Sequence, residues 1–217
     1  MSKSGKPRIA VIGGTGSLGF GLASRLARSF SVTIGSREVS RALESASNAS
    51  GLAGARVDAK TNVDAASACD AAILAVPDLP SREFLSSLAG GLRDKLVISP
   101  IVPMKVKDGV FSISIPGESA AERVAKALPY SRVASAFQTV PAGRLSRMEE
   151  PLDYDVLVTA DSREVYSEAA LIVSSVGKLR PLYAGPLYVS RLVEGMTPAL
   201  LNVSRLNKLN DPSIKLV

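Results

Sequence analysis

Residues Arg8-Ile-Ala-Val-Ile12 lead directly into Gly13-Gly-Thr-Gly-Ser-Leu-Gly19 near the N-terminal end of the 217-residue chain. The first segment is short, apolar and rich in β-branched side chains, as strands buried on both faces of a sheet are. After the glycines, Leu22, Leu26 and Phe30 follow at helical spacing. A strand, a glycine-rich turn and a helix in this order are typical of the first unit of a dinucleotide-binding α/β domain.

The glycine-rich turn carries a recognisable binding motif. Its residues Gly14-Thr-Gly16-Ser-Leu-Gly19 match the pattern G-x-G-x-x-G, which binds a pyrophosphate when it joins a strand to a helix. Gly14 allows the tight turn, Gly16 lets the backbone approach the pyrophosphate, and Gly19 lets helix and strand pack closely. The helix N-terminus attracts the anion. The chain has 17 glycines, so the pattern can also arise by chance. The alternative is therefore a glycine-rich loop that binds no ligand.

Predicted strands and helices alternate along the rest of the chain. Besides the first unit, we expect strands at 31–34, 57–59, 71–76, 96–99, 132–137, 156–159 and 179–182, and helices at 38–49, 63–68, 81–92, 119–128, 163–176 and 187–206. Ser119-Ala-Ala-Glu122 has the spacing of a capping box. The alternation predicts an α/β fold, a doubly wound, Rossmann-type sheet that is mostly parallel, with a C-terminal helical segment.

The end of the second predicted strand indicates which dinucleotide is bound. Sites specific for NAD place Asp or Glu there, about 20 residues after the glycines, to bond the ribose 2′-hydroxyl. This chain has Ser36 and Arg37 instead, with Arg41 four residues further on. A hydroxyl and two guanidinium groups can bind a 2′-phosphate through charge-assisted hydrogen bonds, which favours NADP(H) over NAD(H). A solvated basic turn is the alternative.

Four later strands end in stiff loops that are rich in proline. If these strands are all parallel, their loops lie at the same sheet edge as the glycine loop, where such sheets bind ligands. Proline fixes φ and removes an N–H donor, so the loops would form rigid, apolar walls suited to flat rings. The loops are Val76-Pro77-Asp78, Ser99-Pro100-Ile101-Val102-Pro103, Thr139-Val140-Pro141-Ala142-Gly143-Arg144 and Ala184-Gly185-Pro186-Leu187.

The composition excludes several classes of function. The chain has no histidine and one cysteine, so it has no Ser-His-Asp triad, no internal disulfide and no Cys/His zinc site. We expect no catalytic side chain and no metal, because hydride transfer needs only the alignment of two cofactors. Residues 1–8 are polar and basic, and the longest apolar run, 71–77, is too short to span a bilayer. A cytoplasmic protein is expected.

The net charge of +6, from 26 Lys+Arg and 20 Asp+Glu, allows three interpretations. The charge can serve solubility alone. Nucleic-acid binding is disfavoured, because the basic residues are scattered and only five Phe and five Tyr are available for stacking. An anionic small ligand is the third interpretation. Besides the two arginines already named, weaker candidates for contacts with such a ligand are Lys105, Lys107, Arg144 and Arg191.

Motifs along the whole chain together resemble the NADPH-dependent reductases of coenzyme F420, an 8-hydroxy-5-deazaflavin. Besides the glycine loop they are Gly35-Ser-Arg37, Ala68-Cys-Asp70, Ser99-Pro-Ile-Val-Pro103, Ser119-Ala-Ala-Glu122, Thr139-Val-Pro-Ala142, Leu179-Arg-Pro-Leu182, Ala184-Gly-Pro-Leu187 and Ser190-Arg-Leu-Val-Glu194. The resemblance implies a homodimeric, cytoplasmic enzyme that moves hydride reversibly between nicotinamide C4 and the deazaflavin C5.

The resemblance also implies which residues touch each part of the two cofactors. Thr15, Gly16, Ser17 and Leu18 would hold the pyrophosphate; Ser36, Arg37 and Arg41 the 2′-phosphate; Val76, Pro77, Val102 and Ala142 the nicotinamide side; and Val140, Leu187 and Pro212 the deazaflavin. On this basis residues 1–185 form the NADP-binding domain. Residues 186–217 form a helical segment that closes the deazaflavin crevice.

One position departs from the pattern of the family. Gln138 stands where members often carry histidine, and it can bond a ring but cannot shuttle a proton at neutral pH. Either this position only orients the ring, or the chain passes hydride to another acceptor, such as FMN, FAD, an imine or a ferric chelate. A non-catalytic NADPH-sensing module is a further alternative, although a sensor would not need a second site for a flat ring.

Overall fold

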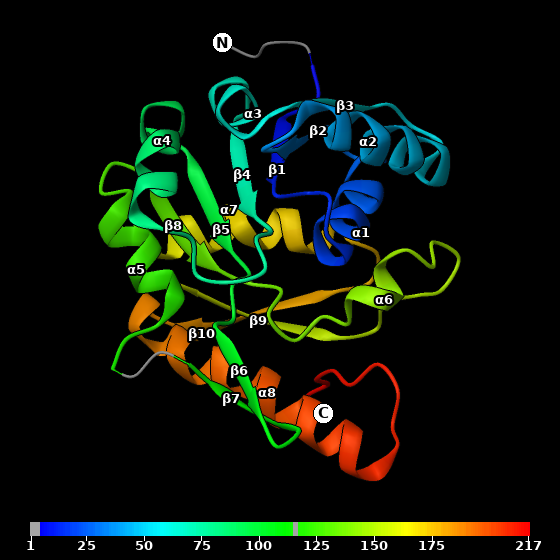
Figure 1. Ribbon diagram of the computed structural model, residues 1–217, viewed down its shortest axis with the longest axis vertical. Coiled ribbons are helices and arrows are strands. Elements are labelled where there is room, and N and C mark those ends of the chain that lie inside the picture. The colour runs from blue at the N-terminus through cyan, green and yellow to red at the C-terminus, as the bar shows by residue number, and fades with distance from the viewer. Residues whose placement is uncertain (1–4, 115–116) are drawn as a thin grey trace.

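The computed structural model describes residues 5–114 and 117–217 (Figure 1). The first four residues of the polar N-terminal segment lie outside this range. Eight strands form one sheet in the order β10-β9-β8-β5-β4-β1-β2-β3. They are β1 (Arg8–Ile12), β2 (Ser31–Ser36), β3 (Val57–Thr61), β4 (Ala71–Leu74), β5 (Leu96–Ser99), β8 (Arg132–Ser135), β9 (Asp155–Ala160) and β10 (Arg180–Gly185).

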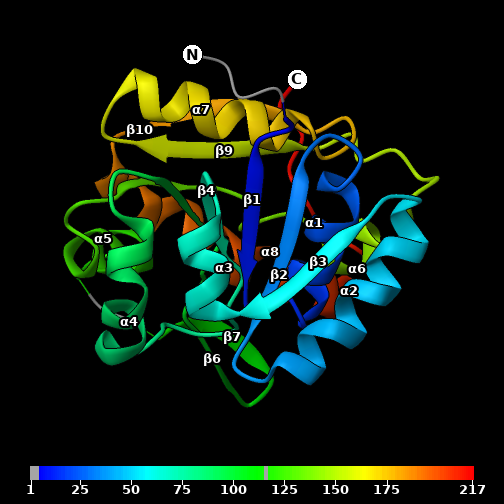
Figure 2. The same cartoon turned by 90° about the horizontal axis from the view of Figure 1, so that it is seen from above.

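Helices cover both faces of this sheet (Figure 2). One buried cluster joins the sheet to α1 (Ser17–Leu26), α2 (Val39–Ala53) and α7 (Arg163–Ser174). A second cluster joins it to α3 (Asn62–Ala68), α4 (Arg82–Leu92) and α5 (Ala120–Ala127). Strands β3, β2, β1, β4, β5 and β8 are parallel to one another. The predicted doubly wound, mostly parallel α/β fold is therefore confirmed.

The last two strands of the sheet reverse its direction. β9 runs antiparallel to β8, and β10 pairs in parallel with β9. The expectation that all four proline-rich loops share one sheet edge is therefore wrong for the loop after β10. That loop leads into a short 3-10 helix, η1 (Leu187–Val189), in which Leu187 is buried in the core cluster of α5. The apolar residues of a strand do not reveal in the sequence which way the strand runs beside its neighbour.

Several helix ends follow directly from local sequence. The capping box expected at Ser119 is present: its Oγ accepts a hydrogen bond from the Glu122 N–H, and the Glu122 side chain accepts one from the Ser119 N–H. Side chains of Thr61 and Ser81 cap α3 and α4 in the same way. The helix α2 ends at Gly54, whose φ of 65° requires the left-handed conformation that glycine adopts without strain.

The remaining elements lie beyond the carboxyl edge of the parallel strands (Figure 1). They are α6 (Ala142–Leu145), α8 (Ser190–Asn207) and a hairpin of β6 (Met104–Lys107) and β7 (Val110–Ile113). Asn202 of α8 accepts a hydrogen bond from the Phe111 N–H and donates one to the Phe111 carbonyl, at 2.8 and 2.9 Å, so the hairpin is tied to the helix. Within the described residues, no helix is long and apolar enough to cross a bilayer.

Candidate functional site: a dinucleotide cavity and a smaller adjoining cavity

The glycine loop is fixed to the end of β2. The N–H groups of Gly13 and Gly14 both donate to the carbonyl of Gly35, at 3.0 and 3.1 Å, and Asn62 Oδ1 also lies 3.3 Å from the Gly13 nitrogen. A Cβ added to Gly19 would come 2.7 Å from the Gly14 Cα, closer than real Cβ contacts. Gly19 therefore lets α1 pack closely on the glycine loop that follows β1 and on Ala75, which follows β4; the sequence predicted close packing of helix and strand at this residue.

The N-terminus of α1 is open. Gly16 is its N-cap, no side chain of the described residues caps it, and its first turn contains no acidic residue. The first amide of the helix to bond a backbone carbonyl is that of Phe20, which donates to Gly16 at 2.8 Å. A Cβ added to Gly16 would meet nothing within 4 Å. Free amide donors beside empty space fit the pyrophosphate of a dinucleotide.

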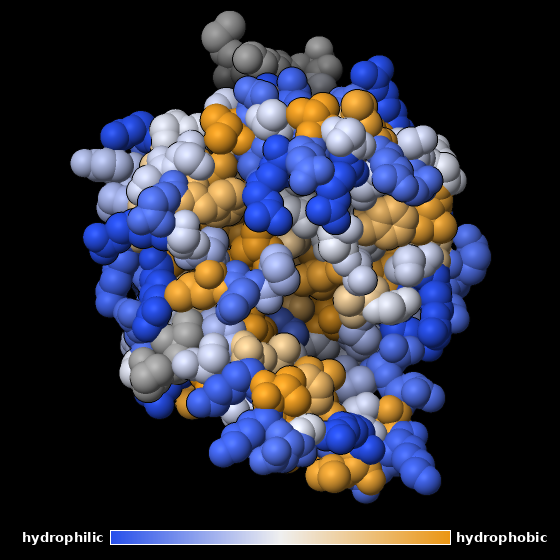
Figure 3. Space-filling view, in the orientation of Figure 1, coloured by the Kyte–Doolittle hydropathy of each residue, from blue (hydrophilic) through white to orange (hydrophobic). Residues whose placement is uncertain are grey.

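A cavity of about 830 Å³ extends from this helix end over the carboxyl edge of the sheet. Figure 3 shows apolar surface in the middle of this face, surrounded by polar residues. Most of the predicted site residues line the cavity: Gly13, Thr15, Gly16, Ser17, Leu18, Gly19, Ser36, Arg37, Arg41, Val76, Pro77, Val102, Gln138, Val140 and Ala142. Gly14 is buried against Ile34 and Leu187 is buried in the core, and neither is among the lining residues.

The cationic end of the cavity lies at the end of β2. Ser36 is buried there, and its Oγ accepts a hydrogen bond from the Glu38 N–H at 3.3 Å. Arg37 and Arg41 line the same cavity, and no ion pair within the described residues involves either. Arg37 precedes α2, and Arg41 lies in its first turn. A hydroxyl and two available guanidinium groups fit a 2′-phosphate.

Gln138 lies at the apolar end of the cavity, with 7% of its surface exposed. Its Nε2 donates to the Ser99 carbonyl at 2.8 Å and to Ser135 Oγ at 2.5 Å. A carbonyl can only accept, so the nitrogen must face Ser99 and the oxygen must face away. Gln138 Oε1 is buried and has no partner within the described residues. Such an acceptor fits an N–H or O–H group of a ligand ring.

A smaller cavity of about 240 Å³ adjoins the first. Both are lined by Gln138, Val140, Ala142 and Thr197. The smaller one is completed by Leu200 and Leu201 of α8 and by Asp211 and Pro212 of the segment after α8. Pro212 therefore lies near Val140, as the resemblance implies, but on the smaller cavity.

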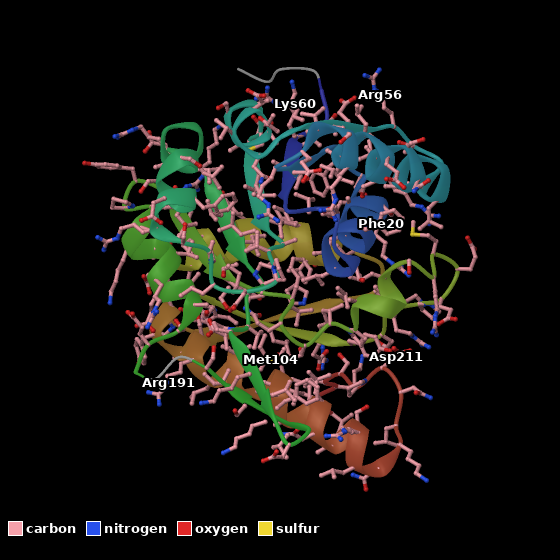
Figure 4. The ribbon with its side chains drawn as sticks, in the orientation of Figure 1. Phe20, Arg56, Lys60, Met104, Arg191 and Asp211 are labelled. Atoms are coloured by element: carbon pink, nitrogen blue, oxygen red, sulfur yellow. The ribbon has the colours of Figure 1, made fainter. Side chains whose placement is uncertain are left out.

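Several lining residues were not singled out from the sequence, and three of them stand out by their position. Asn62 and Thr197 come from helices distant in sequence, and Met104 begins the β6–β7 hairpin. Figure 4 labels Met104 below the sheet edge. A local signal for the hairpin exists in Asp108-Gly109, whose φ angles of 50° and 75° form its turn.

The four weaker cationic candidates are not brought to the site. Lys105, Lys107, Arg144 and Arg191 are absent from the lining of both cavities. Arg144 pairs instead with Glu150 at 2.9 Å. Arg191 lies at the start of α8, far from Asp211 at the other end of the helix (Figure 4).

A buried arginine joins α1 to the loop after β8. Arg25 is almost fully buried and donates to the carbonyls of Leu145 and Arg147, each at 2.7 Å, and of Glu150 at 3.1 Å. Burial lowers the pKa of Arg25. Since α6 begins at Ala142, these bonds hold one wall of the cavity against the helix that begins at the glycine loop.

The side chains that bind metals are not gathered at the site. Within residues 5–114 and 117–217, no group of three or more Cys, Asp or Glu side chains is placed to hold a metal ion. Burial raises the pKa of the Cys69 thiol, which donates to the Ala66 carbonyl. A reaction without a catalytic side chain or metal, expected from the sequence, stays a prediction.

The fold and the cavity are those of a dinucleotide-binding α/β protein, and comparison with known proteins narrows the class. Residues 8–103 match the family described as NADP oxidoreductase, coenzyme F420-dependent. The F420-dependent NADP reductase of Methanothermobacter thermautotrophicus is 37% identical over 218 residues, covering 96% of this chain and 94% of the relative. That of Methanocaldococcus jannaschii is 33% identical over 205 residues, covering 91% and 92%.

A solved structure from Arthrobacter sp. FB24 shares the fold along the whole chain, with a TM-score of 0.82 at 18% identity, covering 98% of this chain and 100% of its own. The two relatives above match nearly end to end at more than 30% identity. This chain therefore belongs to the family of F420-dependent NADP reductases.

Proposed function

We propose that this protein transfers a hydride reversibly between NADP(H) and the deazaflavin coenzyme F420. When bound, the two cofactors supply the chemistry, with the hydride moving between nicotinamide C4 and deazaflavin C5. The protein binds them, aligns their rings and excludes water. One observation carries the proposal: a cavity with phosphate-binding features at one end adjoins a second cavity at its apolar end, where the two share lining residues and where the acceptor ring is placed.

Each part of the large cavity has a role in this proposal. The open N-terminus of α1 binds the pyrophosphate. Ser36, Arg37 and Arg41 bind the 2′-phosphate and so select NADP(H). The rigid walls Val76-Pro77 and Val102 confine the nicotinamide. Residues 186–217 close the crevice over the acceptor ring.

The deciding experiment compares electron acceptors. Purified protein and NADPH are mixed in turn with F420, FMN, FAD and a ferric chelate, and the absorbance of NADPH and of each acceptor is followed. The proposal requires rapid turnover with F420. Turnover with FMN and none with F420 would replace it with a flavin reductase, and tight NADPH binding without any turnover would indicate a sensor.

Gln138 tests how the acceptor ring is held. Its unpartnered Oε1 would accept a hydrogen bond from the ring and orient it. We expect Gln138→Ala to raise the KM for F420 about fivefold, the effect of one hydrogen bond, and to leave NADPH binding unchanged. Gln138→Glu, of the same shape, keeps an acceptor but loses the N–H donor to Ser99. An unchanged KM for F420 in Gln138→Ala would exclude this role.

We also propose that the protein is a homodimer that associates through α8. Tyr188, Leu192, Val203 and Leu206 are exposed apolar side chains, and the last three repeat at helical spacing along one face. Continuous exposed apolar surface is typical of interfaces. Light scattering after gel filtration should give twice the chain mass for the wild type and the chain mass for Leu192→Glu. A cytoplasmic location is likewise proposed, and cell fractionation tests it.

A further inference from the structure

The last residues of the chain form one wall of the smaller cavity. After α8 the chain turns back toward the sheet, as the red segment of Figure 1 shows. Asp211 and Pro212 line the smaller cavity, and neither is among the lining residues of the large one. We call residues 211–217 the C-terminal tail. Terminal segments are usually poorly ordered unless other groups hold them, so the contacts of this tail determine whether the wall exists.

Two backbone contacts begin to hold the tail. Ser213 Oγ donates to the carbonyl of Thr139 at 2.9 Å, and the N–H of Asp155 donates to the carbonyl of Ile214 at 2.8 Å. The tail thereby lies along the start of β9. Ile214 is the buried residue of the tail, and the residues after it are exposed. Apolar burial therefore explains little of how the final residues are held.

The final residues are held by an ion pair between the buried Asp155 and the half-exposed Arg180. The carboxylate of Asp155 is fully buried and receives two hydrogen bonds from Arg180, at Nε and Nη2, each of 2.7 Å. The same carboxylate accepts the N–H of Leu216 at 2.6 Å, and Arg180 Nη2 donates to the Leu216 carbonyl, also at 2.6 Å. Both backbone groups of Leu216 are therefore bound by this one pair.

The carboxylate of Asp155 stays ionised at physiological pH. Hydrogen bonds from Arg180 lower the pKa of Asp155 to about 2 and burial opposes this shift, while the Leu216 N–H adds to it. Among the described residues, the tail also forms ion pairs at its two ends: Lys215 contacts Asp153 at the surface, and Asp211 lies 3.9 Å from Arg144 and 3.5 Å from Arg147. Asp155 is thus an ionised acceptor across the range in which the protein works.

We propose that Asp155 and Arg180 are positioning residues for the electron acceptor. They hold Leu216, which fixes the tail and so keeps Pro212 in place as the outer wall of the smaller cavity. Neither side chain lines either cavity, so they act through the tail alone. This inference rests on the proposed function, which places the acceptor ring in the smaller cavity. NADP(H) binds at the phosphate-binding end of the large cavity, so changes in the tail should not alter its binding.

Leu216 offers a matched pair of variants, because its side chain is exposed. Leu216→Pro removes the N–H that Asp155 accepts, and Leu216→Ala keeps it. We expect Leu216→Pro to raise the KM for F420 about fivefold, as the loss of one charge-assisted hydrogen bond predicts. Its kcat should stay within about twofold, and the KM and Kd for NADPH should not change. Leu216→Ala should match the wild type in all of these values.

A second pair of variants removes charge. Asp155→Asn weakens the bonds with Arg180 and should raise the KM for F420 at least as much as Leu216→Pro. Asp153→Asn removes the same charge two residues away, where the ion pair with Lys215 is mostly exposed, and should have little effect. If Asp155→Asn does not fold, the Leu216 pair decides alone. A parallel rise in the KM for NADPH and F420 would indicate general damage and overturn the proposal.

A readout without F420 separates this inference from the proposed function. Hydrogen exchange at the amide of Asp155, which donates to the Ile214 carbonyl, should be faster in Leu216→Pro than in Leu216→Ala. If the wild type binds NADPH and does not reduce F420, the proposed function fails, and the exchange experiment still tests how the tail is held. Faster exchange with an unchanged KM for F420 would overturn the positioning role. Unchanged exchange would overturn the role of the ion pair in holding the tail.

Discussion

The N-termini of α1 and α5 are built in opposite ways. At α5 the protein itself bonds all of the first amides. Glu122 accepts the N–H of Ser119, Ser119 accepts that of Glu122, and Glu194 of α8 accepts those of Ala120 and Ala121, at 2.9 and 3.2 Å. Two carboxylates thus lie at the positive end of a short helix, an arrangement that stabilises it.

At α1 the corresponding amides have no such partners. Gly16 provides no side chain, and the first turn contains no acidic residue. Uncapped amides cost helix stability that a Ser or Asp N-cap would supply. The contrast shows that capping is available to this fold and is omitted where the helix end faces the large cavity. The positive end of α1 is left for an anionic ligand.

Gly16→Asp should convert the open helix end into a closed one. A Cβ there meets no protein atom within 4 Å, so the substitution is sterically allowed. An N-cap carboxylate should stabilise α1 by about 0.5–1 kcal/mol and at the same time repel the pyrophosphate. We expect the Kd for NADPH to rise more than about 100-fold, measured by fluorescence titration, with Tm unchanged or higher. This is the largest effect that we predict.

Gly16→Asn is the matched control for this prediction. It caps the helix with the same geometry and carries no charge, so it should stabilise α1 similarly and weaken NADPH binding far less. Equal losses of affinity in the two variants would show that space, and not charge, decides binding. Unchanged affinity in Gly16→Asp would place the pyrophosphate elsewhere.

Gly19→Ala should instead damage the protein itself. Its Cβ would come 2.7 Å from the Gly14 Cα and 3.0 Å from the Ala75 Cβ, and backbone atoms cannot move aside as a flexible side chain does. Strain of this kind costs about 1–3 kcal/mol. We expect the free energy of unfolding, measured in urea, to fall by about 2 kcal/mol. A variant that stays fully stable and loses only NADPH affinity would contradict this division of roles.

The nucleotide end of the site could be predicted from sequence because its signals are local. The glycine motif is recognised from the spacing of its own residues, and Ser36 and Arg37 from their place at the end of the second strand; the capping box at Ser119, elsewhere in the chain, is a local signal of the same kind. Turn geometry and capping depend on such neighbours. The predicted strands on either side of the glycine loop therefore match β1 and β2, and the residues of this end line one cavity.

The acceptor end depends on partners that are far apart in sequence. Glu194 and Ala120 are 74 residues apart, and Leu216 and Asp155 are 61 apart. No spacing rule connects such residues before the chain folds. The direction of β9 and β10 was hidden for a related reason, since their apolar residues suit either direction. The wrong expectation for the sheet edge of the loop Ala184-Gly185-Pro186-Leu187 follows from that ambiguity.

Ser36→Asp should shift the cofactor preference from NADPH toward NADH. The new carboxylate would lie beside Arg37 and Arg41, repel a 2′-phosphate and bond a 2′-hydroxyl. We expect the ratio of kcat/KM for NADPH over NADH to fall about tenfold or more, a change of about 1.4 kcal/mol or more. Ser36→Ala, which removes the hydroxyl without adding charge, should change the ratio less. An unchanged ratio in Ser36→Asp would mean that the 2′-phosphate binds elsewhere.

The N-terminus of α5, which Glu194 closes, should give a different kind of effect, a dependence of stability on pH. Burial raises the pKa of Glu194 to about 7, although the N–H groups of Ala120 and Ala121 favour its charged form. Between about pH 4.5 and 7 the folded protein keeps a proton that the unfolded chain releases. The free energy of unfolding should therefore fall as pH rises through this window, by at most about 1.4 kcal/mol per pH unit.

Glu194→Gln isolates this contribution, because it removes the titrating group and keeps one acceptor for the α5 amides. Asp155, whose pKa is lowered to about 2, loses its stabilising charge only at pH values below about 4. Urea unfolding from pH 5 to 8 therefore avoids the window of Asp155 and reports on Glu194. If the free energy of unfolding of the wild type does not change from pH 5 to 7, or if Glu194→Gln shows the same dependence on pH as the wild type, then Glu194 is ionised throughout this range. In that case the two helices would differ in permanent charge. The N-terminus of α5 would always have the negative charge of Glu194 beside it, whereas the N-terminus of α1 would gain a negative charge only when an anionic ligand binds.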